Sequence, residues 1–450
     1  MAVAIVKRVL IGVVIAAIGV TAYLMPAPDP EPEPLAGVIV DRLGIESPAD
    51  AAIWYCPWAQ STTERDSLIS LVSVNSAAAE LTLPVLIPGS PPDQTATSMS
   101  GPGGAIITLS EVAQRGDSPG FIEFDGGPSA ASVTVTGDVL AADACVARGT
   151  DEWFFVGGST MTGDSLKLRL FNPFPESAVV TITAFSEIGT EVLGTLGRVT
   201  VRSRSWQDVE FAEQLRQRES LVISVRLESG LAVPAMSFSR GADEAWWSGT
   251  DVSTNWEMPI ARVSLGDEAA IIIANPGLAD VTADVEIYGT DAQHRQLISV
   301  DVAAGAPTRV DLTELALEFD AVGARVAASG PVVAGVVSVG PSGTAVTAGA
   351  PSQGTTWLLP GTAPTADTSV SLWLLNTSDS AIVVTVSRLT AGEVFNVNEI
   401  LEPGTVTRIP VVGVDTLGYL VRSSDPFTAS WTANGGSGLA VSGALLVVDE

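Results

Sequence analysis

Histidine and cysteine, the side chains that most often carry nucleophilic catalysis or zinc binding, are nearly absent from this sequence. The chain has one histidine, His294, and two cysteines, Cys56 and Cys145. A zinc site needs three or four such ligands, so we expect none. A Ser-His-Asp or Cys-His mechanism would depend on His294 alone. That residue lies in the polar stretch GTDAQHRQL, where an exposed hairpin residue is the simpler interpretation. The sequence therefore predicts no catalytic residue and no metal.

Acidic residues are plentiful, with 51 Asp and Glu against 22 Lys and Arg and a net charge of −29. A chain this acidic is repelled by phosphates, which excludes nucleic acid as a partner. A glycosidase-like pair of carboxylates stays open as a lesser alternative. The glycine cluster Gly101–Gly104 (GPGG) has no lysine after it, so it is a turn and not a phosphate loop. We expect no cofactor.

Aromatic side chains are the better candidates for binding. Trp246 and Trp247 are adjacent, so on a strand they point to opposite faces. We take Trp247 as the candidate ligand-facing aromatic, since an exposed indole offers a flat platform to a sugar or a partner protein. The alternative is that both rings pack in a core.

An N-terminal segment places the rest of the chain in space. Val9–Met25 contains no charge, and its 17 residues span about 25 Å as a helix, close to the thickness of a bilayer core. Lys7 and Arg8 precede it and acids follow, which predicts a cytoplasmic N-terminus and an exported remainder. A cleaved signal peptide is the alternative, although no small-residue cleavage site ends the run.

Export gives the two cysteines a meaning. In an oxidising compartment, Cys56 and Cys145 of one module are expected to form a disulfide. The alternative is two buried thiols.

A repeat with a period of 103 and then 101 residues follows. Trp153, Trp256 and Trp357 each open a segment, and an asparagine ends an apolar run 19 residues later, at Asn172, Asn275 and Asn376. Trp54 and Asn75 open a diverged first copy with a spacing of 21 residues. We interpret these residues as structural.

The strands after each asparagine, such as AVVTITAF and VTADVEIY, alternate or are rich in β-branched residues. The Asn-Pro or Asn-Thr pair between them is typical of a turn, in which the amide bonds nearby backbone. Asp208 and Asp311 each precede a short segment with helical character and are expected to cap it.

These elements define the predicted architecture: an all-β chain with an N-terminal transmembrane helix followed by tandem Ig-like β-sandwich modules. The alternative is a β-propeller in which each repeat supplies two blades. The expected boundaries are a cytoplasmic stub at 1–8, an anchor at 9–25, a Pro-rich acidic spacer at 26–35, and modules at 36–150, 151–250, 251–352 and 353–450.

The modules resemble a repeat family of unknown function found in membrane-anchored actinobacterial envelope proteins. The likeness rests on three motifs: Trp153 with Gly157 and Gly158; Leu168, Asn172 and Pro173; and Ser329–Gly330–Pro331–Val332–Val333–Ala334. The third copy departs from the pattern at Pro259 and Ile260, and the fourth at Thr377 and at Asp425–Pro426–Phe427. The resemblance implies an exported β-sandwich array and supplies no catalytic residue.

The functional expectation is a non-catalytic, extracytoplasmic scaffold of the cell envelope, held by one membrane span and contacting an envelope protein or wall glycan. A wall-glycan-binding protein that uses exposed aromatics is the alternative. An acid-based enzyme acting on a wall polymer is the third.

Overall fold

Four groups of β-strands make up the part of the chain described by the computed structural model. It describes residues 51–83, 93–99, 101–112, 116–147, 150–262, 264, 266–293, 295–313, 322–341, 343–361, 368–391, 393–411 and 415–446. The expected anchor, spacer and His294 lie outside these residues. In the described residues no helix is long and apolar enough to cross a membrane. The described residues, from Ala51 to Leu446, belong to one compact unit.

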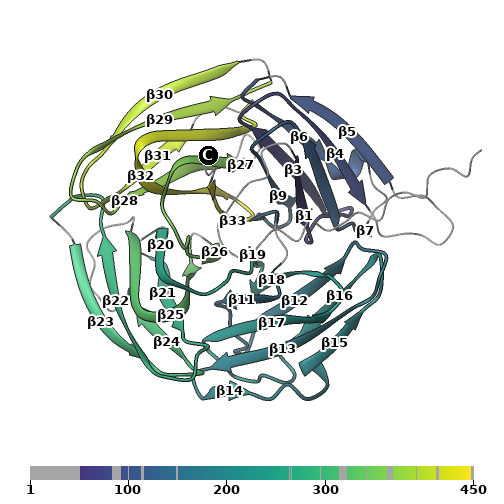
Figure 1. Cartoon of the computed structure of the whole chain (residues 1–450), viewed down its shortest axis with the longest axis vertical. Coiled ribbons are helices and arrows are strands. Elements are labelled where there is room, and N and C mark those ends of the chain that lie inside the picture. Colours follow the sequence, from purple (N-terminus) through teal and green to yellow (C-terminus); the bar gives the residue numbers. More distant parts are fainter. Residues whose placement is uncertain are drawn as a thin grey trace, which may run out of the picture. The chain divides into compact units, whose positions relative to one another are not determined.

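The groups, called modules 1 to 4 from here on, follow the chain and lie around a common centre (Figure 1). Module 1 contains β1 (Ala51–Cys56), β2 (Gln60–Ser61), β3 (Arg65–Ser73), β4 (Ala77–Leu83), β5 (Asp93–Met99), β6 (Gly103–Thr108), α2 (Leu109–Val112), β7 (Gly116–Asp117), β8 (Gly120–Asp125), β9 (Ser129–Gly137) and β10 (Ala141–Ala144). Module 2 contains β11 (Glu152–Val156), β12 (Asp164–Asn172), β13 (Ala178–Ser186), β14 (Gly189–Glu191), η1 (Gly194–Gly197), β15 (Arg198–Val201), β16 (Ser205–Glu210), β17 (Leu221–Ser229), β18 (Val233–Arg240) and β19 (Asp243–Ser248).

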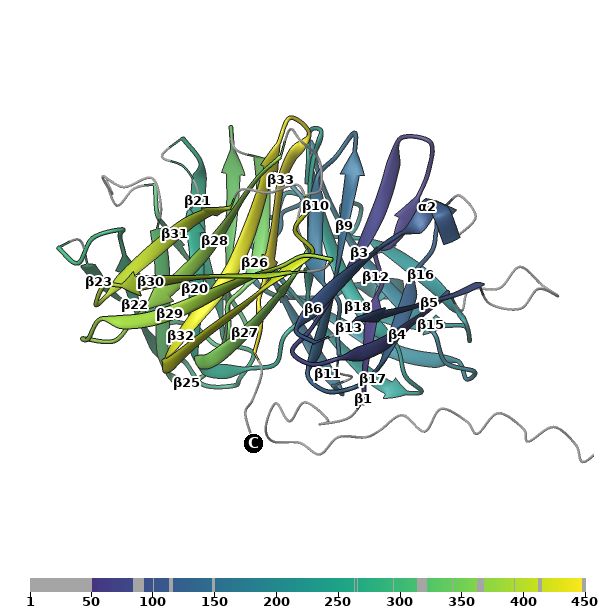
Figure 2. The ribbon, with the colours of Figure 1, turned by 90° about the horizontal axis from the view of Figure 1, so that it is seen from above.

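Module 3 contains β20 (Ser253–Arg262), β21 (Glu268–Ala274), β22 (Val281–Tyr288), β23 (Arg295–Val302), β24 (Pro307–Asp311), β25 (Val322–Gly340) and β26 (Gly343–Ala348). Module 4 contains β27 (Gly354–Pro360), β28 (Ser369–Asn376), β29 (Ile382–Leu389), β30 (Val394–Leu401), β31 (Thr405–Val411), β32 (Gly418–Gly435), β33 (Gly438–Gly443) and β34 (Leu445–Leu446). Figure 2 shows the same strands from the side, with the short α2 at the periphery of module 1.

All four modules have the same strand order. In module 2 one antiparallel sheet runs β11-β17-β13-β14, and the other runs β16-β12-β18-β19. Modules 1, 3 and 4 repeat both orders with their own strands, for example β1-β8-β4-β5 and β27-β32-β29-β30. Each sheet therefore takes strands from both halves of its module, so the two sheets cannot form one after the other along the chain.

The passage from one sheet to the other occurs at a sharp corner. In modules 3 and 4 a single long strand, β25 or β32, pairs with members of both sheets. In modules 1 and 2 the corresponding strands are separate, and Gly126 and Gly230 lie between them with φ angles of 127° and 68°. A Cβ at either glycine would meet a backbone oxygen, that of Ser76 at 2.4 Å or Ser177 at 2.5 Å. Only glycine fits the corner in modules 1 and 2.

Alternating side chains fill the space between the two sheets of each module. Along β13, for example, Ala178, Val180, Ile182 and Ala184 are buried, while the residues between them are partly exposed. The module cores also continue into their neighbours. The core of module 1 includes Trp246 of module 2 and Leu358 of module 4. At the centre, β10, β19, β26 and β33 contact one another.

Candidate functional site

The four repeat tryptophans lie at equivalent places, on β1, β11, β20 and β27, and are buried: Trp54, Trp153, Trp256 and Trp357. In two modules the indole spans the corner between the sheets. Trp256 Nε1 donates to the carbonyl of Val332 at 3.1 Å, and Trp357 Nε1 donates to that of Phe427 at 2.9 Å. These buried rings therefore help to fix the two sheets of a module against each other and present no face to solvent.

The three repeat asparagines make matching hydrogen bonds. The amide of Asn172 donates to the carbonyl of Glu176 at 2.7 Å, and its Oδ1 accepts from the N–H of Phe174 at 2.9 Å. Asn275 does the same with Ala279 at 2.7 Å and Gly277 at 2.9 Å. Asn376 binds Ser380 and Ser378, at 2.8 and 3.0 Å. A second donation reaches Val201, Val302 or Leu401. Each buried amide thus closes the turn after its strand.

Module 1 departs from this pattern at a residue other than the expected one. Asn75 is exposed, and its N–H donates to the hydroxyl of Ser73 at 3.3 Å. Ser73 is buried, ends β3 as Asn172 ends β12, and lies 19 residues after Trp54. The repeat spacing is therefore kept in module 1, with serine at the equivalent position. The prediction that Asn75 is the repeat residue of module 1 was wrong. It followed the residue type, whereas the position 19 residues after the tryptophan is Ser73.

The residue after each tryptophan faces the next module. Tyr55 lies 5.8 Å from the ring of Phe174 in module 2, and Phe154 packs into the core of module 3. Glu257 accepts from the hydroxyl of Thr377 in module 4 at 3.1 Å. Leu358 packs into the core of module 1. These contacts, here called seams, join the modules in a closed succession.

A buried carboxylate lies in the seam between modules 3 and 4. Glu257 is 4% exposed and accepts hydrogen bonds from Thr377, from the Gln353 amide at 2.5 Å and from the Thr428 hydroxyl. Burial raises the pKa of Glu257, although these donors work in the opposite direction. The seam thus contains a satisfied polar group.

The seam between modules 1 and 2 is built on a buried cation, Arg169 of β12, which is 3% exposed. Its guanidinium binds both oxygens of Asp208 at 2.8 Å and one oxygen of Asp117, from module 1, at 2.9 Å. The ring of Trp58, also from module 1, lies 4.5 Å away. Burial alone would lower the pKa of Arg169, but the two carboxylates raise it above the ordinary value. Arg169 therefore stays charged and binds residues of both modules.

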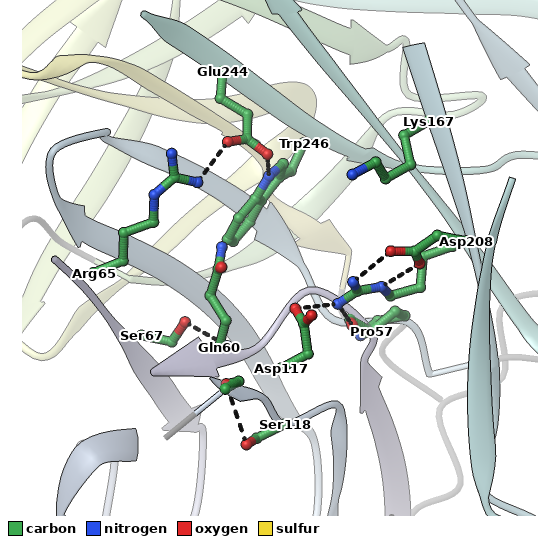
Figure 3. A network of polar contacts seen from close by, with 12 residues as sticks. Pro57, Gln60, Arg65, Ser67, Asp117, Ser118, Lys167, Asp208, Glu244 and Trp246 are labelled. Atoms are coloured by element: carbon green, nitrogen blue, oxygen red, sulfur yellow. Dashed lines mark hydrogen bonds and ion pairs between the residues drawn. The ribbon is translucent and has the colours of Figure 1, made fainter. Parts of the chain in front are cut away.

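Further contacts extend this seam, as Figure 3 shows. Trp58 stacks on Trp246 of module 2 with ring centres 5.9 Å apart. Trp246 Nε1 donates to Glu244 at 2.7 Å, and Glu244 accepts from Arg65 of module 1 at 3.0 Å. The cluster alternates charge and aromatic surface, and its charges are paired within it. The cluster therefore joins module 1 to module 2.

Near the centre, Asp143 of β10 accepts from the hydroxyl of Ser248 of β19 at 2.7 Å. Burial raises the pKa of this carboxyl to about 7, against the lowering effect of its hydrogen bonds. This part of the seam therefore changes charge near neutral pH.

Trp247 does not offer a face to a ligand. It is 3% exposed, and it packs in the core of module 2 while Trp246 packs in the core of module 1. Both rings are buried because both faces of β19 are covered, one by its own module and one by the seam. Of the ten tryptophans, only Trp206 lies outside the buried set.

Asp208 does not cap a helix, contrary to expectation. It lies within β16 and pairs with Arg169. In the part of the chain that the structure describes, no group of three or more His, Cys, Asp or Glu residues could hold a metal ion.

The expected disulfide between Cys56 and Cys145 is confirmed, with Cα atoms 4.6 Å apart and a sequence separation of 89. It joins the end of β1 to the residue after β10.

The predictions from the sequence did not include Arg169, Trp58, Glu244 or Glu257 as seam residues. One signal for Arg169 was present, because LKLRLFN alternates leucine with two bases in a strongly acidic chain. Its partners lie 39 and 52 residues away, which periodicity cannot reveal.

Fold and site together define an all-β repeat protein of antiparallel sheets. Residues 127–237 and 246–446 match a family of unknown function, DUF5719, and the chain belongs to that family. No curated protein matches it.

Similarity to solved structures is slight. Thermotoga maritima 1070 is 15% identical over 22% of this chain and 93% of its own, with a TM-score of 0.20. An α-L-rhamnosidase of Streptomyces avermitilis in complex with L-rhamnose is 9% identical, over 82% and 55%, with a TM-score of 0.13. The FN1-FN3 domains of chicken CNTN1 are 8% identical, over 70% and 92%, with a TM-score of 0.10. Scores this low define no shared fold.

Proposed function

We propose that this protein is a non-catalytic scaffold of the cell envelope, with residues 9–25 as its single membrane span and modules 1 to 4 outside the cytoplasm. The observation that carries the proposal is the use of the repeat residues. The tryptophans and asparagines close the modules, and the residues after the tryptophans join them. The repeat thus serves to build one stiff body for display.

The disulfide supports export. Cys56–Cys145 is of the kind that persists in oxidising compartments and is rare in the cytosol. The charge pattern around Val9–Met25, basic before and acidic after, supports the same orientation. The likeness to actinobacterial envelope repeats points to the same setting.

Glycan binding through tryptophan platforms ranks lower because nearly all tryptophans are buried. An acid-based enzyme ranks lowest. Asp117 and Asp208, in the seam between modules 1 and 2, both bind Arg169. Carboxylates committed to one buried cation are poorly placed to exchange a proton with a substrate.

We also propose to class the modules as β-sandwiches and not as pairs of propeller blades. A blade is a meander of consecutive strands, whereas each sheet here draws strands from both halves of its module. The likeness to immunoglobulin domains is partial. In module 3 the pairing of second with fifth and third with sixth strands, β21 with β24 and β22 with β25, is shared with that fold. The first strand, however, pairs with the sixth, as β20 with β25.

The test is the location and extractability of the full chain in the cells that make it. We expect it in the membrane fraction after an alkaline carbonate wash, cleaved by protease added to intact spheroplasts. A variant without residues 1–25 should leave that fraction. A full chain that is protected from the protease and found with cytosolic markers would overturn the proposal.

A further inference from the structure

Exposed apolar side chains gather on one hairpin of module 4. Large hydrophobic residues are exposed at only a few places among the described residues, and five of them lie on β29 and β30: Val383, Val394, Phe395, Val397 and Ile400, which are 41–61% exposed. Strand β30 is the last strand of its sheet, with β29 as its ladder partner in the described structure. The hairpin therefore combines an open backbone edge with apolar side chains.

Equivalent strands of the other modules show that the fold does not require this. In module 1, β5 reads DQTATSM, and its one large hydrophobic residue, Met99, is buried. In module 2 the position is divided between the short β14 and β15. In module 3, β23 exposes Leu297. Ile188 and Val192, which are exposed in module 2, lie beside the short β14 and not on it. Among these strands only β30 exposes four large apolar side chains, with Asn396 and Asn398 exposed between them. Such edges are normally blocked by charge, proline or a bulge.

The backbone of β30 is set out to accept a further strand. The β29–β30 register runs without a shift from Ile382↔Leu401 to Leu389↔Val394. Thr390 donates to the carbonyl of Glu393 at 3.1 Å, which fixes the alternation of bonded and non-bonded pairs. By that alternation the N–H and C=O groups of Val394, Asn396, Asn398 and Ile400 point away from β29.

One exposed side chain of β30, Phe395, is held in place by a neighbour. The guanidinium of Arg388 lies 4.5 Å above the ring of Phe395 and also pairs with Asp415 at 3.0 Å. Phe395 and Val397 lie on one face of the strand, and Val394 and Ile400 on the other. An added strand would therefore gain apolar neighbours on both of its faces.

Charge indicates which strand would fit. Glu393, Glu399 and Glu402 lie within or beside β30, and the whole chain carries a net charge of −29. A second copy would bring the same acids and the same net charge to the contact. We propose that β30 binds an extended segment of a partner protein that alternates apolar and basic residues, by addition of that segment as a strand. This inference rests on the proposed scaffold role for its biological setting and names the surface by which the scaffold holds a partner.

The experiment uses the purified full chain and a blocked peptide that alternates lysine and valine. We expect saturable binding, with a matched peptide of glutamate and valine binding at least about tenfold more weakly because of charge. N396P removes one outward N–H and leaves the pairing with β29 in place. It should weaken the lysine peptide by about tenfold. Because N396P does not change net charge, non-specific attraction to the acidic chain would survive it.

Leu297→Ser on β23 is the control and should bind as the original chain does. Should N396P unfold the module, the double variant Val397→Thr, Ile400→Thr tests the same edge with β-forming residues. Equal binding of the lysine peptide to the original chain and to both variants would overturn the proposal. So would self-association of the chain that N396P abolishes, or loss of wall-glycan binding in N396P without any peptide binding. Failure here leaves the envelope location untouched, since extraction and protease access test that separately.

Discussion

Module 1 and modules 2 to 4 share one strand order but close it with different bonds. In modules 2 to 4 a buried asparagine amide binds the turn after the second strand, whereas module 1 has Ser73 there. Module 1 instead has the Cys56–Cys145 disulfide. Its seam with module 2 contains the buried cation Arg169, whereas apolar residues of modules 2 and 3 share one core. Module 1 thus lacks the buried amide of the turn but has a covalent link elsewhere, between the end of its first strand and the residue after its last.

The largest expected effect is that of the disulfide. Cys56→Ser combined with Cys145→Ser should lower the free energy of unfolding by about 4–5 kcal/mol in the chain-entropy model. Urea unfolding measures the total, and hydrogen exchange locates it in β1 and β10. A loss under about 1 kcal/mol, or one spread evenly over all modules, would contradict the view that the disulfide stabilises module 1.

The buried cation of the first seam comes next. Arg169→Met leaves Asp208 and Asp117 without their partner and should destabilise the protein by about 3–5 kcal/mol. The control is Arg198→Met, because Arg198 is 70% exposed in its pair with Glu228 and should cost under about 1 kcal/mol. Equal melting curves for the two variants would show that the seam does not depend on Arg169.

The asparagine and the serine can be compared directly. Asn275→Ala removes hydrogen bonds to Ala279, Gly277 and Val302 and should cost about 2–3 kcal/mol. Ser73→Ala removes a weaker set and should cost about 1 kcal/mol or less. Thermal unfolding of both single variants decides. A larger loss at Ser73 would mean that module 1 depends on this turn as much as the others do.

The smallest effect depends on pH. The pKa of Asp143 is about 7 in the folded protein, above the usual value of about 4 in an unfolded chain. The folded state therefore binds the proton more tightly, and this contribution to stability is complete below about pH 4 and lost as pH rises towards 7. Asp143→Asn should remove the dependence and raise the free energy of unfolding at pH 8. Unfolding at pH 4.5 and pH 8 checks this. If the variant keeps the same change in stability between the two pH values, another group than Asp143 causes it.

The all-β fold class could be predicted from the sequence because the same local strand and turn patterns recur in each module. The Trp–Asn spacing and the β-branched runs predicted strands at these places, and the structure has them. The predicted hairpins are wrong, because the strand before each asparagine and the strand after it lie in different sheets of the module. The disulfide followed from two cysteines in one module. These inferences needed only the order of residues along the chain.

The seams could not be read in this way. Trp247 was predicted to be exposed because one module alone covers only one face of β19. The other face is covered by module 1, so both tryptophans are buried. Asp208 looked like a cap because Arg169 lies in another strand. Such contacts depend on which sheets meet, and that is settled by the packing of all modules together.

The disulfide also has a mechanical consequence. Cys56 ends β1, the first strand described, and its partner Cys145 follows the last strand of module 1. A pull applied to the chain before β1 would pass through the sulfur–sulfur bond to Cys145. The 88 residues between the two cysteines would be shielded from tension. Under tension, the chain between Cys56 and Cys145 would not extend, and any extension would come from modules 2 to 4.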